Sequence, residues 1–249
     1  MIRSILKGNN RKIYIMLFWI AAWEILSLII NREIYLPSPY VVFQALIDLL
    51  KERNTYITIA YSTYRTLAGF IISCAAGVIT GYMCGTSEFM HDLFSPLIGT
   101  IRTVPVMSII IIAIMWFRDT NVPIFVAFLM CYPIIWINTV SGIKSADIKL
   151  LQMCRIYNIK KIQIIKSVYF YSALPYIKAS MISALGIGWK VTSAAEILSL
   201  PRHSIGRYLY DSKVYLEIPD LFAWTAIIIL LSYIFENALK KLFKSRNYD

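Results

Sequence analysis

The sequence predicts an all-α polytopic membrane protein, and three observations support this fold class. Of its 249 residues, 58% are hydrophobic and only 16% are charged, a balance that a soluble domain of this length does not show. Apolar runs long enough to cross a bilayer recur along the whole chain. Basic residues collect at the ends of these runs, where they orient helices in a membrane. We therefore do not interpret the net charge of +11 as a nucleic-acid surface.

Six spans are expected, forming one transmembrane domain over residues 1–249 with both termini cytoplasmic. The orientation follows from the larger number of Lys and Arg residues in the inner segments. No small-x-small cleavage site follows the first apolar run, so we expect an uncleaved anchor. Ser38 and Pro39 predict the start of a further helix over residues 40–52 on the outer surface. The expected spans cover residues 13–30, 60–83, 93–117, 122–140, 176–198 and 221–239.

Small residues recur every four positions in two spans and predict close helix packing. In the second span we expect this packing within one subunit rather than at a dimer seam. In the fifth span we expect residues 180–192 to face a second copy of the chain, with the pathway at the two-fold axis between the third and fifth spans. The two stripes are Gly69, Ser73, Gly77, Gly81 and Gly85, and Ser180, Ala184, Gly188 and Thr192.

Charged residues inside the spans are candidates for a translocation pathway, because burying a charge in lipid is costly. Arg102 lies three residues before Pro105, which predicts an interrupted helix beside a polar cavity. The alternative is that these charges pair with acidic residues and only hold helices together. The candidate pathway residues are Arg65, Arg102, Pro105, Lys190 and Glu196.

The segment over residues 146–175 is the longest one without a span, and it predicts two short amphipathic helices. Leu150, Cys154 and Tyr157 form one apolar stripe at i, i+4 and i+7. The break between the helices is expected at residues 157–159, because Asn158 tolerates the left-handed conformation that ends a helix. Such a helix-turn-helix is shaped to dock into a groove on a soluble partner, although a basic loop lying on the lipid surface is the alternative.

This segment resembles the cytoplasmic coupling loop of ABC-importer permeases, whose motif is roughly E-A-A-x-x-x-G. Gln152, Met153 and Cys154 stand at the E-A-A positions, and Asn158 stands at the Gly position. The missing motif Gly puts the turn geometry in question rather than the docking. The resemblance implies that the following residues contact an ATPase: Leu151, Gln152, Met153, Cys154, Arg155, Tyr157, Asn158 and Ile159.

The rest of the chain resembles the nitrate, taurine and alkanesulfonate branch of these permeases over nearly its full length. The resemblance implies a multi-pass protein of the cell membrane that works as a homodimer with two ATPase subunits and an extracytoplasmic solute-binding protein. The matching pieces are Leu36–Pro39, Arg65–Phe70, Pro96 with Ile101–Pro105, Trp116–Phe117, Ala184–Trp189, Ala195–Glu196 and Ile205–Gly206.

Two other classes compete with an ABC permease. An ion-coupled secondary carrier would use Glu24, Lys190 and Glu196 as a relay, but no inverted repeat is evident. A membrane enzyme would need a nucleophile-base pair or a metal cluster, and the sequence shows neither. No G-x-x-x-x-G-K-[ST] loop occurs, so we expect no enzymatic activity and no cofactor on this chain. The substrate stays open among sulfonates, taurine, nitrate, bicarbonate and pyrimidine precursors of thiamin, with an anion favoured by the basic pathway residues.

Overall fold

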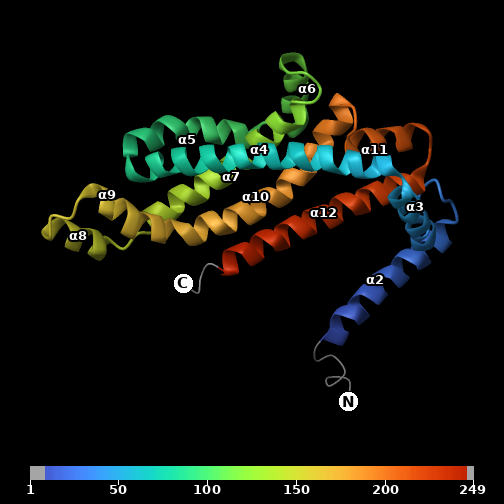
Figure 1. Cartoon of the computed structure of the whole chain (residues 1–249), viewed down its shortest axis with the longest axis horizontal. Coiled ribbons are helices and arrows are strands. Elements are labelled where there is room, and N and C mark those ends of the chain that lie inside the picture. Colours follow the sequence, from blue (N-terminus) through green and yellow to red (C-terminus); the bar gives the residue numbers. More distant parts are fainter. Residues whose placement is uncertain (1–8, 246–249) are drawn as a thin grey trace. The chain divides into compact units, whose positions relative to one another are not determined.

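The computed structural model describes residues 9–245, which form helices joined by loops, with no strand among them (Figure 1). This confirms the predicted all-α fold class. The helices are α2 (Asn9–Ile30), α3 (Pro39–Lys51), α4 (Arg53–Thr86), α5 (Glu88–Thr103), α6 (Val106–Trp116), α7 (Val122–Lys144), α8 (Ile148–Ile156), α9 (Lys161–Ile164), the π-helix η1 (Ile165–Tyr169), α10 (Phe170–Ser199), α11 (Ile205–Val214) and α12 (Ile218–Ser245).

The chain divides into two compact units, and α4 and α12 each contribute residues to both. The first unit comprises Met1–Thr58 with Tyr208–Ile227, and the second comprises Ile59–Arg207 with Ile228–Asp249. A single permease domain over residues 1–249 stays a prediction.

In the first unit, the connection from α2 to α3 is fixed by side-chain hydrogen bonds. Trp23 Nε1 donates to the carbonyl of Pro37 at 3.1 Å, and the Ser27 hydroxyl donates to the carbonyl of Leu36 at 3.0 Å. The Ser38 hydroxyl accepts from the Val41 N–H at 3.4 Å, and Pro39 is the first residue of α3. The hydrogen bond to Ser38 confirms the predicted cap. Proline suits the first position of the helix, because it has no N–H that would be left unpaired there.

In the second unit, α7 lies at the centre and packs extensively against α10. The glycine stripe of α4 allows α7 to approach within the same chain, as predicted. A Cβ added at Gly69 would lie 2.6 Å from the carbonyl oxygen of Ile124, and one at Gly81 would lie 2.7 Å from Thr139 Cβ. Because both distances are shorter than van der Waals contact, the helix spacing depends on these glycines.

The small stripe of α10 differs from the expectation that it faces a second copy. Ser180, Ala184 and Thr192 are buried within the chain, and Gly188 lies against Cys131 of α7. The exposed face of α10 is rotated away from this stripe and carries Ser183, Ile187 and Lys190. The reason is that small side chains are used where backbones approach most closely, and α7 already occupies that face.

Four helices are long and apolar enough to cross a membrane, as far as the described residues show. They contain Ile13–Ile30, Arg53–Thr86, Val122–Lys144 and Ile218–Lys244. The pair α5 and α6 also qualifies when taken together, with a bend of 101° between its halves. This break lies at Val104 and Pro105, where an interruption was predicted from Arg102 and Pro105.

Helix α10 has 30 residues but is not among these candidates, and it carries Lys178, Lys190 and Glu196. If α10 spans the membrane, its charged side chains must therefore be buried in protein or face a polar cavity. The count of six spans and the cytoplasmic placement of both termini remain predictions.

The predicted helix-turn-helix over residues 146–175 is present in its first half but differs in its second. Helix α8 ends at Ile156, and the chain turns as expected at Asn158. The second helix does not stop before the fifth span, because α9, η1 and α10 form one continuous helical path from Lys161 to Ser199. No residue there ends a helix, and the π-helical turn of η1 absorbs the change in register ahead of Pro175.

Candidate functional site

A buried ion pair joins α4 to α10 in the second unit. Arg65 Nη1 lies 3.0 Å from Glu196 Oε1, with exposed fractions of 2% for Arg65 and 0% for Glu196. The Ser62 hydroxyl lies 2.9 Å from each carboxylate oxygen of Glu196. The N–H of Gly206 donates to Glu196 Oε2 at 3.1 Å. The carboxylate is thus surrounded by donors, as a buried charge requires.

Arg65 also holds the loop between α10 and α11. Its guanidinium donates to the carbonyl oxygens of His203 at 3.1 Å and Arg202 at 3.2 Å. This loop contains Leu200 and His203 at φ 47° and 54°, a left-handed conformation that non-glycine residues seldom adopt. The hydrogen bonds from Arg65 therefore stabilise an otherwise unfavourable path of the chain.

Three pieces of the family resemblance that lie far apart in sequence meet at this ion pair. They are the segment beginning at Arg65, the dipeptide ending at Glu196, and Ile205 with Gly206. A Cβ at Gly206 would lie only 2.4 Å from Glu196 Cβ, so the close approach requires glycine. Sequence reasoning assigned Arg65 and Glu196 to the pathway separately and missed their contact, because no local spacing links residues on different helices.

The remaining candidate pathway residues, Arg102, Pro105 and Lys190, are exposed on the surface of the chain. Within the described residues, neither Arg102 nor Lys190 forms an ion pair, and Glu196 is paired with Arg65 instead. Helix α5 presents a polar exposed face beside Arg102, and a Cβ at Gly99 would meet nothing within 4 Å. These charges therefore face the surroundings of the chain rather than its core.

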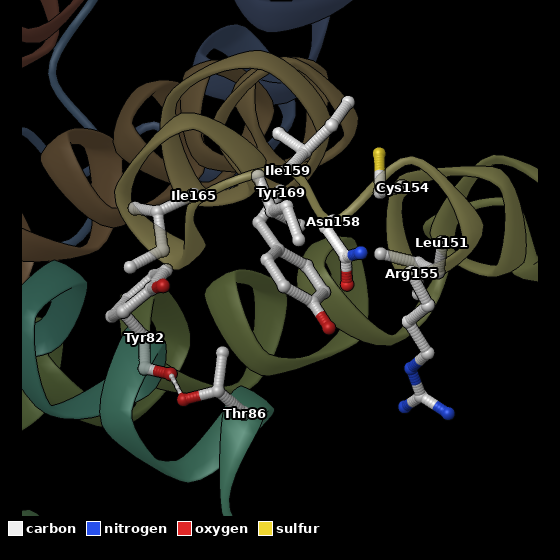
Figure 2. Close-up of a pocket in the computed structure, with 10 residues that line it drawn as sticks. Tyr82, Thr86, Leu151, Cys154, Arg155, Asn158, Ile159, Ile165 and Tyr169 are labelled. Atoms are coloured by element: carbon white, nitrogen blue, oxygen red, sulfur yellow. Dashed lines mark hydrogen bonds between the residues drawn. The ribbon is translucent and has the colours of Figure 1, made fainter.

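A cavity of about 700 Å³, here called the coupling cavity, lies between α8, the end of α4 and η1 (Figure 2). Figure 2 shows the Tyr169 ring between Tyr82 on one side and Asn158 on the other, with the Arg155 guanidinium pointing outward. Its lining residues are Tyr82, Thr86, Leu151, Cys154, Arg155, Asn158, Ile159, Ile164, Ile165 and Tyr169. The predicted coupling residues Gln152, Met153 and Tyr157 do not line it and are exposed.

The turn after α8 has the geometry that the family motif's Gly would supply. Asn158 has φ 49°, and the N–H of Ile159 donates to the carbonyl of Cys154 at 2.9 Å. Asparagine is the non-glycine residue suited to this left-handed position. The departure from Gly at residue 158 therefore leaves the turn intact.

Apolar side chains are exposed along α8 and at its C-terminal end, together with the polar residues Lys149, Gln152 and Arg155. Ile156 and Tyr157 are 76% and 72% exposed, and Ile148 and Met153 are also exposed. The predicted stripe is split, because Cys154 is half-buried at the coupling cavity while Tyr157 lies on the outer face. Sequence reasoning missed Ile148 and Ile156, since both faces of this short helix carry apolar residues.

Comparison with known proteins defines the class. Residues 77–246, more than half of the chain, match the family described as the binding-protein-dependent transport system inner membrane component. The chain therefore belongs to this family. It is an ABC-importer permease of the nitrate and sulfonate type and a multi-pass protein of the cell membrane.

Individual relatives agree with this class. The putative aliphatic sulfonates transport permease protein SsuC of Bacillus subtilis is 28% identical over 192 residues, covering 75% of this chain and 69% of the relative. The nitrate import permease protein NrtB of Synechococcus elongatus is 31% identical over 156 residues, covering 62% of this chain and 55% of the relative. A structure of the MetNI methionine ABC transporter has the same fold, with a TM-score of 0.62 at 16% identity, covering 79% of this chain and 95% of that one.

Proposed function

We propose that this chain forms the translocation pathway of an importer for a small anionic solute. In this proposal, six spans place both termini in the cytoplasm, and an extracytoplasmic binding protein delivers the solute. Two separate ATPase subunits drive transport through the loop that carries α8, and the permease itself works as a homodimer. The observation that carries the proposal is the group of exposed apolar side chains on α8 and at its C-terminal end, on a strongly basic loop of a permease-family chain.

The face of α8 supports docking to a partner because it has no protein core of its own to join. Ile156 and Tyr157 expose most of their apolar surface at the end of the second unit from which α8 projects (Figure 1). Exposed apolar side chains gathered on one helix mark interaction surfaces, and an amphipathic helix fits a groove. The ATPase is the partner that a permease without its own ATP-binding loop requires.

The surface charges support an anionic solute. Arg102 and Lys190 lie on exposed faces of α5 and α10, where a second copy of the chain would enclose a polar space between them. The relatives are named for aliphatic sulfonates, nitrate and bicarbonate, all of which carry negative charge. We therefore propose a small anion of this kind as the substrate; taurine and thiamin-pyrimidine precursors stay open. The ion-coupled carrier has no support, because its proposed relay residue Glu196 is neutralised by Arg65.

The coupling test uses Ile156→Arg, because a charge on the exposed apolar face would have to be buried in the partner's groove. We expect folded permease in normal yield but loss of co-purifying ATPase and of ATP-dependent uptake. Val214→Arg is the matched control, since Val214 is also an exposed apolar residue on a short helix. Normal uptake with Ile156→Arg would overturn the proposed docking face.

A further inference from the structure

Two cavities meet at the end of the second unit that carries α8. The coupling cavity has mixed walls, with the polar groups of Thr86, Asn158 and Arg155 among its lining. A second cavity of about 290 Å³ follows α4, α7 and α10, and its walls are almost entirely apolar. Tyr82, Ile165 and Tyr169 line both cavities, so the two adjoin at these side chains. We call this pair the double cavity, with the coupling cavity as its polar end and the second cavity as its apolar end.

The polar end lies in a strongly basic segment of the chain. Residues 144–178 contain seven Lys or Arg residues and one acidic residue, Asp147. Arg155 at the mouth of the coupling cavity forms no ion pair among the described residues, and no carboxylate lines the cavity. A ligand that fits this end therefore carries a negative charge, which complements the positive charge of Arg155.

We propose that this double cavity binds an anionic phospholipid of the cytoplasmic leaflet. The phosphate lies at the mouth of the coupling cavity, between the outward-pointing guanidinium of Arg155 and Asn158, and one acyl chain passes Tyr82 and Tyr169 into the apolar cavity beside Ile79. Basic pockets at the cytoplasmic ends of membrane helices take anionic head groups in this way, and tyrosines are common at the level of the head groups. The inference rests on the proposed cytoplasmic placement of α8, but not on transport itself.

The bound lipid would connect α8 to the membrane helices. The coupling cavity separates α8 from α4 and η1, and a π-helical turn at this junction is a place where a helix can adjust its register. Filling the cavity with a lipid holds α8 in position while its opposite face, around Ile156 and Tyr157, stays available to the ATPase.

The test measures lipid that remains bound to the purified full-length chain after reconstitution in phosphatidylcholine containing phosphatidylglycerol. Arg155→Gln should lower retained phosphatidylglycerol by about tenfold or more, the effect of one charge-assisted hydrogen bond. Lys149→Gln removes an exposed charge outside the cavity. It should lower retained phosphatidylglycerol by no more than a few-fold, the effect of a general surface charge. Native mass spectrometry counts the retained lipid, and gel filtration checks that each variant is folded.

A second pair of variants tests the apolar end. Ile79→Trp should fill the apolar cavity and lower retention of the lipid, whereas Ile71→Trp on the same helix should not. The two positions are 61% and 62% exposed, so both variants should fold alike. Because the retention measurements on these variants contain no ATP, solute or ATPase, failure here is distinguishable from failure of the transport proposal.

Three outcomes would overturn the inference. Equal loss with Lys149→Gln and Arg155→Gln would show only general attraction to a basic surface. Equal retention by Ile79→Trp and Ile71→Trp would show that no acyl chain enters the apolar cavity. Displacement of the lipid by glycerol phosphate alone, or by added ATPase, would assign the space to a free phosphate or to the protein partner.

Discussion

The two ends of α10 are built differently. Near Ser199, the Arg65–Glu196 pair is buried, surrounded by hydrogen bonds and bonded to the loop between α10 and α11. Near Phe170, the chain has a π turn, a large cavity and an α8 that exposes apolar side chains. The difference indicates that the polar contacts within the chain are concentrated at the first end, while our proposal assigns the exposed groups of the second end to partners.

The largest effect in this comparison is expected from Glu196→Ala. The substitution leaves Arg65 buried without its counter-ion, and breaking a buried pair in this way costs about 3 to 5 kcal/mol. We expect a marked fall in the thermal unfolding midpoint in detergent and a low yield of folded protein. Lys190→Gln on the same helix is the control, because Lys190 is exposed and surface changes are usually within about 0.5 kcal/mol. Equal thermal unfolding midpoints for Glu196→Ala and Lys190→Gln would contradict the assignment of stability to the end of α10 near Ser199.

An intermediate effect is expected where α4 meets α7. Gly69→Ala should lower the free energy of unfolding by about 1 to 3 kcal/mol, because the new methyl group meets the backbone of Ile124. Gly99→Ala should have no such cost, since a Cβ there meets nothing within 4 Å and alanine favours the helix. Thermal unfolding of the pair in detergent checks this. A destabilised Gly99→Ala chain would mean that the exposed face of α5 is covered by another part of the assembly.

The smallest effect is expected at the turn of the coupling end. Asn158→Val should disfavour the left-handed conformation by about 1 to 2 kcal/mol, whereas glycine adopts it freely. Limited trypsin cleavage after Lys160 measures local opening, and it should be faster in Asn158→Val and not in Asn158→Gly. The global unfolding temperature should barely move, because few buried groups depend on this turn. A large drop in that temperature would show that the coupling end belongs to the cooperative core.

Much of the architecture was predictable because its signals are local. Ser38 with Pro39 predicted a helix start, Asn158 predicted a left-handed turn, and Pro105 predicted a broken helix; the structure confirms all three. The glycine stripe of α4 likewise predicted close packing within the chain. Each of these depends on the preferences of one residue or on a short repeat along one helix.

The contacts between helices could not be read in this way. The sequence by itself determined an all-α membrane chain with a basic amphipathic loop, since composition and periodicity record what each segment can bury. Only the tertiary structure decided that Arg65 pairs with Glu196, that Ser183 rather than Ser180 is exposed, and that Ile156 and Tyr157 are exposed at the end of α8. The physical reason is that each of these depends on the rotation of one helix against another, and a helix with small or apolar residues on two faces leaves that rotation open.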